Sequence, residues 1–291
     1  MKNIRIFCFG FGQVARSFLN KVSSANINLH ISTTNTSKTC IKKLKNIEYK
    51  SYKFKTDNFD PLITNELKKS DHILVSIPPI NGEDIVIKKF SNTLKISKIK
   101  WATYLSATSV YGDHKGEWVD EMSETKPTTS NGLDRLKVEQ EWLALSNKIN
   151  LPFQIFRLSG IYSNKYNAIQ RLKSEATSII KKKNHYFSRI HVDDIANILF
   201  KSLSIFKSNE IYNISDDRPA SSEDVMMYAV KILNSDVPKI INEKQLESKM
   251  LINFYKDSKK VSNKKMKNFF NYKLKFPTYV EGLNYIRNNL T

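Results

Sequence analysis

The chemistry encoded most plainly in the chain is phosphate binding close to its N-terminus. Gly10, Gly12 and Ala15 form a Gly-x-Gly-x-x-Ala pattern directly after a short apolar run, where a first strand would turn into a first helix. The first glycine permits a tight turn, the second lets the backbone approach a pyrophosphate, and the small third residue allows close helix–strand packing. Backbone amides at the helix start, at Gln13 and Val14, then hold the phosphates. The pattern therefore predicts a dinucleotide-binding turn.

The residues that follow the second predicted strand indicate which dinucleotide is bound. An NAD site usually carries Asp or Glu about 20 residues after the glycines, where it accepts hydrogen bonds from the ribose hydroxyls. Residues 30–38 contain no acid, and the first carboxylate after the glycines is Glu48. The hydroxyl of Thr34, the amide of Asn35 and the ammonium of Lys38 suit a 2′-phosphate better, although this segment contains no arginine. We expect a nicotinamide dinucleotide cofactor, NADP in preference to NAD.

Five further strings carry a resemblance that spans nearly the whole chain. In chain order they are YLSATSVYG (104–112), IFRLSGIY (155–162), RIHVDDIA (189–196), IYNISDD (211–217) and an ending with KVSN, FPTY and EGL (260–283). Together they resemble the extended short-chain dehydrogenase/reductases, the NAD-dependent epimerase/dehydratase group. The resemblance implies a Rossmann-type cofactor domain and a small C-terminal lobe that closes over the substrate. It also implies cofactor contacts at the ends of strands, namely Ile77, Pro78, Ser106 and Leu158.

The residues that carry the chemistry in that family are replaced in this chain. The family uses a Tyr as general acid/base, a Lys four residues later that lowers the Tyr pKa and holds the nicotinamide ribose, and a Ser that orients the substrate oxygen. Aligned on Glu139, the Tyr position is Asn131 and the Lys position is Arg135, and counting back from residues 110–112 places Ala107 at the Ser position. An amide cannot shuttle a proton and arginine stays protonated. The chain thus resembles the atypical subgroups without the usual triad, with Arg135 still able to hold a ribose or a phosphate.

Two tyrosines are candidates for a replacement acid, because each follows a strand near the expected nicotinamide position. They are Tyr111 and Tyr162. The expected substrate contacts are Ser109, Trp118, Asn131, Arg189 and His191. Two functions stay open on this basis. One is an NADP-linked oxidoreductase or epimerase-like enzyme with a non-standard acid/base, and the alternative is a redox-inactive dinucleotide-binding sensor or regulatory protein.

No metal site is expected. The acids of residues 116–124 are irregularly spaced, which is typical of a solvated loop. Asp193 and Asp194 follow His191, and the two carboxylates more simply cap a helix predicted over residues 195–203 than bind a metal.

These residues need a scaffold of alternating strands and helices. Apolar runs typical of buried strands recur at residues 4–9, 28–33, 72–77, 100–106 and 153–158, separated by helix-like stretches. This alternation predicts an α/β fold, a Rossmann-type doubly wound parallel sheet with helices on both faces.

The expected domains are a dinucleotide-binding Rossmann domain over residues 1–163 and a smaller C-terminal substrate lobe over residues 164–291. A strand at Glu210–Ile214 is expected to return to the main sheet. Helices over residues 83–95 and 128–148 could pair in a homodimer, as in the family, or could only cover the sheet.

Composition narrows the class of protein. The 291 residues are 40% hydrophobic, and two cysteines are too few for a disulfide framework. No uncharged run approaches the roughly 18 residues that a membrane helix needs, so we expect a cytoplasmic protein with a small-molecule substrate. The formal net charge is +19, but 39 of the 47 basic residues are lysines scattered along the chain. Nucleic-acid sites favour arginine, and nucleic acid is therefore an unlikely partner.

Overall fold

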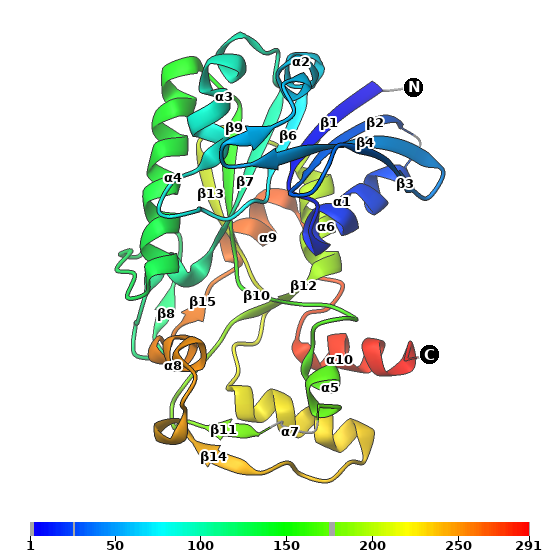
Figure 1. Ribbon diagram of the computed structural model, residues 1–291. Coiled ribbons are helices and arrows are strands. Elements are labelled where there is room, and N and C mark those ends of the chain that lie inside the picture. The colour runs from blue at the N-terminus through cyan, green and yellow to red at the C-terminus, as the bar shows by residue number, and fades with distance from the viewer. Residues whose placement is uncertain (1–2, 26, 175–177, 291) are drawn as a thin grey trace. The chain divides into compact units, whose positions relative to one another are not determined.

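A nine-stranded, mostly parallel sheet organises the computed structural model, which describes residues 3–25, 27–174 and 178–290 (Figure 1). The strand order is β13-β9-β7-β6-β1-β2-β4-β3, and β5 pairs with β4. The bounds are β1 (Asn3–Phe9), β2 (Asn28–Asn35), β3 (Cys40–Leu44), β4 (Ile47–Lys55), β5 (Asn58–Phe59), β6 (His72–Val75), β7 (Trp101–Ala107), β9 (Phe153–Leu158) and β13 (Glu210–Ile214).

The order of these strands confirms the predicted doubly wound fold. From β1 the chain adds β2 and β4 on one side, then returns to add β6, β7, β9 and β13 on the other. Pairs β1–β2, β1–β6, β2–β4 and β6–β7 are parallel. In such a sheet, ligands bind at the carboxyl ends of the strands where the winding reverses, here beside β1 and β6. All five predicted strands are present, and the Glu210–Ile214 segment does return to the main sheet as β13.

One face of the sheet is covered by α2 (Leu62–Lys69), α3 (Ile85–Ile96) and α4 (Ser130–Ile149). Their apolar side chains and those of the strands form one buried cluster, in which Trp142 stacks on Phe153 at 5.1 Å between ring centroids. The Asp84 carboxylate begins α3 by accepting hydrogen bonds from two backbone amides, and its second oxygen accepts from the indole of Trp142. The start of α3 is thereby tied to α4.

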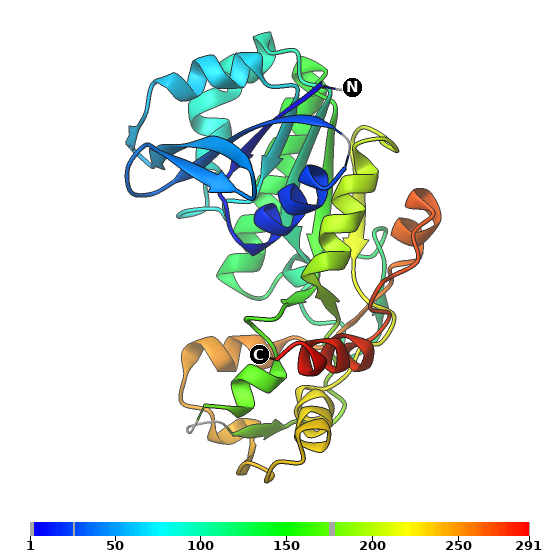
Figure 2. The same cartoon turned by 90° about the vertical axis from the view of Figure 1, so that its right-hand side faces the viewer.

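The opposite face carries α1 (Gln13–Ser23) and α6 (Val192–Ser202) (Figure 2). The apolar residues of α1 recur at helical spacing, which buries one stripe of the helix against the sheet. Phe18 of α1 stacks on Trp101 of β7 at 5.9 Å, and the Trp101 indole donates a hydrogen bond to Ser202 of α6. These contacts fix the start of α1 at the carboxyl end of β1.

The connection between β2 and β4 differs from the expected helix-like stretch. The chain forms the edge strand β3, which runs antiparallel to β4 with Lys42 opposite Tyr49 and Cys40 opposite Ser51. Between residues 33 and 72 it therefore contains β3, β4 and β5, with α2 as the single helix of that interval. A parallel crossover usually contains a helix. Here its place is taken by a hairpin that widens the sheet.

The chain divides into two compact units, each built from three segments. Unit 1 comprises Met1–Ser106, Leu133–Arg157 and Ile195–Tyr212, and unit 2 comprises Ala107–Gly132, Leu158–Asp194 and Asn213–Thr291. The expected division into residues 1–163 and 164–291 treats the two parts as consecutive. The units are instead interleaved, because the chain leaves the main sheet after β7 and again near the end of β9.

Unit 2 consists of short helices and three two-stranded parallel ladders. The ladders are β10 (Gly160–Tyr162) with β12 (Arg189–His191), β11 (Ile179–Lys181) with β14 (Ile240–Asn242), and β8 (Trp118–Val119) with β15 (Lys260–Val261). The helices are α5 (Ala168–Leu172), α7 (Ser222–Leu233), α8 (Lys249–Lys256), α9 (Lys264–Phe270) and α10 (Tyr279–Asn288). Among the described residues, no helix combines the length and apolar character that a membrane span requires.

Candidate functional site

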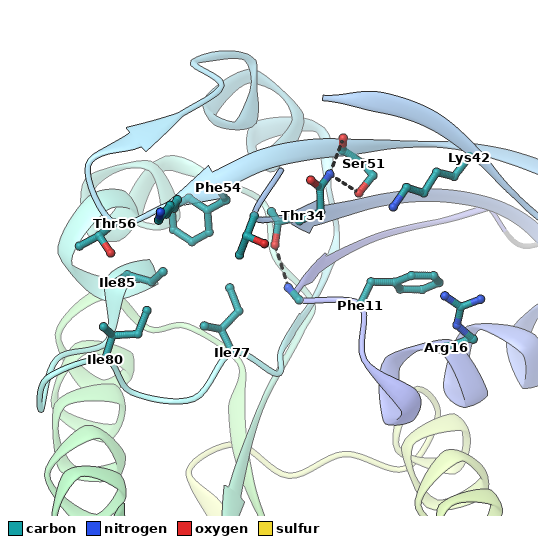
Figure 3. Close-up of a pocket in the computed structure, with 14 residues that line it drawn as sticks. Phe11, Arg16, Thr34, Lys42, Ser51, Phe54, Thr56, Ile77, Ile80 and Ile85 are labelled. Carbon is teal, nitrogen blue, oxygen red and sulfur yellow. Dashed lines mark hydrogen bonds between the residues drawn. The ribbon is translucent and has the colours of Figure 1, made fainter. Parts of the chain in front are cut away.

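A cavity of about 340 Å³ lies at the carboxyl ends of β1, β2 and β4, wholly within unit 1 (Figure 3). We call it the edge cavity. Its lining residues are Gly10, Phe11, Arg16, Thr34, Asn35, Thr36, Lys42, Ser51, Phe54, Lys55, Thr56, Ile77, Ile80 and Ile85. This is the place where a doubly wound sheet binds its ligand.

The glycine turn forms the floor of the edge cavity. Gly10 has φ +85°, and a Cβ there would lie 2.7 Å from the Ser76 hydroxyl oxygen, so the position requires glycine. The Gly10 amide donates to the Thr34 hydroxyl at 2.8 Å, which ties the end of β1 to β2. Gly12 begins α1 without a side-chain cap, and a Cβ there would have no atom within 4 Å. The space in front of the helix start is therefore open.

One end of the edge cavity is apolar. Figure 3 shows Phe54, Ile77, Ile80 and Ile85 gathered there, from β4, from the segment after β6 and from the start of α3. Phe54 is held by aromatic neighbours in the core, with its ring 5.5 Å from that of Phe90. These side chains form an apolar surface against which a flat ring could pack.

The other end of the edge cavity is cationic. Arg16 and Lys42 lie there, Lys55 also lines the cavity, and the lining contains no Asp or Glu. The segment after β2 contains no arginine, whereas α1 supplies one to the cavity. The sequence could have indicated this arginine, because Arg16 follows directly after Ala15 of the glycine pattern.

The three side chains expected to bind a 2′-phosphate have different positions. Thr34 and Asn35 line the edge cavity, but Lys38 is exposed and does not. The Asn35 amide nitrogen donates to the Lys38 carbonyl and to both the carbonyl and the hydroxyl of Ser51, at 2.8–3.1 Å, and its oxygen accepts from the Ser37 amide. Asn35 thus holds the loop after β2 in place.

The remaining expected cofactor residues lie around the ends of other strands. Ile77 lines the edge cavity, whereas Pro78 is exposed and does not. Ser106 is buried at the end of β7, and its hydroxyl has no hydrogen-bond partner among the described residues. The Arg135 guanidinium donates to the Leu105 carbonyl at 3.0 Å, which places it beside the same strand end. Leu158 is buried in unit 2.

A buried ion pair joins α4 to the main sheet. Arg157 of β9 and Glu139 of α4 are paired at 2.7 Å, with both side chains almost fully buried. Glu139 thereby connects its helix to the sheet. The charge of Arg157 is therefore matched inside the protein. Tyr104 lies close by, and burial raises its pKa while the Arg135 charge opposes that rise.

Both candidate acids lie in the interior of unit 2. Tyr111 has no exposed surface, and its hydroxyl donates to the Asn213 side-chain oxygen at 2.8 Å. The Tyr162 hydroxyl donates to the Thr278 carbonyl at 3.4 Å, and it packs so closely on α10 that a Cβ at Gly282 would overlap it. Burial raises the Tyr162 pKa. The acid role of either phenol stays a prediction.

Three of the named residues share one face of the β10–β12 ladder. Its register places Gly160 opposite Arg189 and Tyr162 opposite His191, so Tyr162, Arg189 and His191 project to the same side. The Arg189 guanidinium donates to the carbonyls of Phe187, Ala220 and Ser221. Burial lowers the pKa of His191 to about 4, so this ring is neutral near pH 7.

The other expected substrate residues lie elsewhere in unit 2. Trp118 on β8 is 56% exposed, and Asn131 is exposed in the first turn of α4. Ser109 lies in the short helix at Thr108–Tyr111, and its carbonyl would be 2.7 Å from a Cβ at Gly132. Glycine at 132 therefore allows the start of α4 to approach this segment.

The expected helix cap by the Asp pair is wrong. Helix α6 begins at Val192, so both acids lie in its first turn. The Asp194 carboxylate accepts hydrogen bonds from the Tyr272 hydroxyl and from the amides of Lys275 and Phe276. It therefore anchors the segment before α10. In the part of the chain that the structure describes, no three His, Cys, Asp or Glu side chains gather as a metal site.

One buried acid was not predicted from the sequence. Asp216, which follows β13, is 1% exposed, and one of its carboxylate oxygens has no hydrogen-bond partner among the described residues. Burial raises its pKa well above the usual value, although the nearby Arg189 charge lowers it. Its sequence context, in the string IYNISDD, carries no signal of burial.

Comparison with models of protein families gives no match, and comparison with curated proteins gives none either. Solved structures with a similar backbone do exist. A conserved protein of unknown function from Silicibacter pomeroyi DSS has a TM-score of 0.86 and 28% identity, over 98% of each chain. UDP-glucuronic acid 4-epimerase from Bacillus cereus, in complex with NAD, has a TM-score of 0.77 and 16% identity, over 98% of this chain and 99% of that one.

A further similar structure is UDP-glucose 4-epimerase from Thermotoga maritima with UDP-glucose. Its TM-score is 0.76 at 13% identity, over 99% of this chain and 100% of the other. Similarity at such low identity concerns the fold. It agrees with the strand order described above. The chain accordingly has the fold of the extended short-chain dehydrogenase/reductases of the NAD-dependent epimerase/dehydratase type, as its sequence motifs indicate.

Proposed function

We propose that unit 1 binds a nicotinamide dinucleotide in the edge cavity, and NADP(H) in preference to NAD(H). One observation carries the proposal. A single cavity at the reversal point of the sheet combines a glycine turn, an apolar end and three cationic side chains, and it contains no carboxylate. A ribose diol is normally held by a carboxylate, whereas a 2′-phosphate is held by cations.

Each part of the dinucleotide has a matching set of residues. The base would lie against Phe54 and the isoleucines, and the pyrophosphate would lie against the Gly10–Gly12 turn and the start of α1. Arg135 would hold the nicotinamide ribose from the end of β7. A bound nicotinamide dinucleotide supplies hydride-transfer chemistry, and this chain's own residues bind and orient it.

The residues at the positions of the family's Tyr–Lys proton relay favour binding without that relay, as in a sensor or regulatory protein. Asn131 and Arg135 replace the relay pair, and Arg135 cannot exchange a proton. A second candidate is an NADP-linked oxidoreductase or epimerase-like enzyme with a different acid. The shared face of Tyr162, Arg189 and His191 favours this second candidate.

Thermal unfolding with NADPH, NADH or no ligand tests dinucleotide binding. A ligand at about 100 times its Kd adds roughly 2.7 kcal/mol to the free energy of unfolding. We expect a larger rise in Tm with NADPH than with NADH at matched salt. A Tm unchanged by either dinucleotide would contradict the proposal.

Turnover is tested separately. The near-ultraviolet absorbance of NADPH is followed during incubation with sugar nucleotides, aldehydes and ketones. A stable absorbance with bound NADPH favours the sensor function. A decrease that is lost in Tyr162→Phe, but kept in Tyr166→Phe, favours the enzyme.

A further inference from the structure

We propose that Arg16 and Lys42 form a two-sided clamp for the 2′-phosphate, and that this pair sets the preference for NADP(H). The inference rests on the proposed function of unit 1 and names the residues that recognise the 2′-phosphate. Thr34 and Lys38, which the sequence offered for this role, do not form the clamp. The two clamp residues come from α1 and β3, on opposite sides of the cationic end of the edge cavity (Figure 3).

Arg16 is held in position by aromatic rings. Its guanidinium carbon lies 5.0 Å from the centroid of the Phe11 ring, and the Phe11 ring lies 5.2 Å from that of Tyr49. Tyr49 is buried, so this stack has a fixed base. A cation above an aromatic face is attracted to it, which restrains the side chain, and a planar guanidinium can bind two phosphate oxygens at once. No carboxylate of the described residues forms an ion pair with Arg16.

Lys42 is brought to the same place by the β3–β4 hairpin. It lies directly opposite Tyr49 in the antiparallel register, and side chains of directly opposed residues project to the same face of a sheet. Tyr49 is therefore the common neighbour of Lys42 and of the Phe11–Arg16 stack. Among the described residues, no carboxylate lies within ion-pair distance of Lys42.

Neighbouring lysines of the hairpin are engaged elsewhere. Lys43, on the other face of β3, pairs with Glu48 at 3.5 Å. Lys45 in the hairpin turn donates to the Ser24 hydroxyl at 2.6 Å. Neither of these lysines lines the edge cavity. From β3, the hairpin thus presents Lys42 to the edge cavity without an ion-pair partner among the described residues. The neighbouring lysines provide matched controls.

The arrangement of hydroxyl groups agrees with a phosphate between the two cations. Thr36 and Ser51 line the edge cavity together with Lys42, and the Asn35 amide holds the loop that carries Thr36. Hydroxyl donors and cations without a carboxylate are the usual surroundings of a bound phosphate. A carboxylate in the same place would select the diol of NAD instead.

The experiment compares dinucleotide affinities by titration calorimetry at matched salt. Wild type, Arg16→Gln, Lys42→Met and the control Lys43→Met are each titrated with NADPH and NADH. We expect Arg16→Gln to weaken NADPH binding about tenfold or more and Lys42→Met severalfold, since a hydrogen-bonded charge pair contributes about 1.5–3 kcal/mol. NADH binding should change little in both variants. The control should match the wild type.

Smaller probes separate the phosphate from the rest of the ligand. Adenosine 2′,5′-bisphosphate should bind wild type more tightly than adenosine 5′-monophosphate, and this difference should disappear in the double variant Arg16→Gln/Lys42→Met. Unchanged Tm values of the unliganded variants would show that the exposed substitutions leave the fold intact.

The outcomes distinguish the two proposals. If wild type binds neither dinucleotide, the proposed function is wrong and the clamp is wrong with it. If wild type binds NADPH but Arg16→Gln and Lys42→Met leave the NADPH-to-NADH ratio unchanged, only the clamp is wrong. An equal loss of NADPH and NADH affinity would also overturn the clamp, because it would place both cations against the shared pyrophosphate.

Discussion

Replacement of Gly12 by aspartate should increase the stability of the protein and abolish dinucleotide binding. Gly12 begins α1 with φ −77° and ψ −169°, an extended conformation open to any residue, and a Cβ there meets no atom within 4 Å. Aspartate at a helix start accepts hydrogen bonds from backbone amides, which is worth a few tenths of a kcal/mol over glycine. Its charge adds about 0.3–1 kcal/mol against the helix dipole. We expect Gly12→Asp to raise the free energy of unfolding by about 0.5–1 kcal/mol.

The same carboxylate should abolish dinucleotide binding. It would lie at the helix start, where the pyrophosphate is expected. Two like charges about 4 Å apart repel by about 4 kcal/mol at an effective dielectric constant near 20. That energy corresponds to roughly a thousandfold loss of affinity. NADPH at about 100 times the wild-type Kd would then add less than about 0.1 kcal/mol to the variant, compared with roughly 2.7 kcal/mol for wild type.

The assay is thermal and denaturant unfolding of wild type, Gly12→Asp and Gly12→Asn, each with and without NADPH. Asparagine has nearly the shape of aspartate without its charge, so it should keep part of the NADPH-induced stabilisation. The reasoning is refuted if Gly12→Asp is stabilised by NADPH as strongly as wild type is. A variant that is less stable than wild type without ligand would refute the assigned conformation at this position.

Three further predictions concern buried charges. Glu139→Gln should lower the free energy of unfolding by about 3 kcal/mol, because it removes the carboxylate that neutralises the buried Arg157 charge. Glu139→Gln/Arg157→Met should recover much of the loss in denaturant unfolding. Burial lowers the pKa of His185 to about 4, so its contribution to stability is present above pH 6.5 and is lost as the pH falls toward 4. His185→Phe should therefore reduce the acid-induced loss of stability by about 2–3 kcal/mol. Asp216 has a raised pKa, so its contribution is present at low pH and is lost as the pH rises. Asp216→Asn should therefore raise the Tm above neutral pH, whereas Asp217→Asn, which breaks a contact with Lys267, should not.

Much of the main sheet was predictable from the sequence, because its signals are local. Each buried strand shows a short apolar run, and Gly10 marks a turn at φ +85° that other residues rarely adopt. The β3 strand was not predictable in the same way. Its residues are mostly exposed, and Lys42 and Lys43 read as a solvated segment. That segment becomes a strand only by pairing with β4, which is a nonlocal interaction.

Side-chain roles at the site show the same division. The sequence placed Asn35 and Lys38 among the cofactor ligands, whereas Asn35 holds a loop and Lys38 does not line the edge cavity. The sequence likewise does not reveal that Arg157 is paired with Glu139 in the interior. The partners of a side chain depend on which distant segments pack against it. Those partners cannot be read from a single sequence.

The residue identities that limit the chemistry therefore follow from the sequence alone: the glycine turn, the lack of an acid after β2, and Asn131 and Arg135 at the positions of the family's Tyr and Lys. Which charges meet in one cavity depends on how the chain folds. Arg16 and Lys42 are far apart in the chain and carry no shared local signal. They come together because α1 packs on the sheet beside β1 while the hairpin register sets Lys42 against Tyr49. Such contacts arise from the packing of the whole unit, whereas turn and strand preferences arise from steric limits within a few residues.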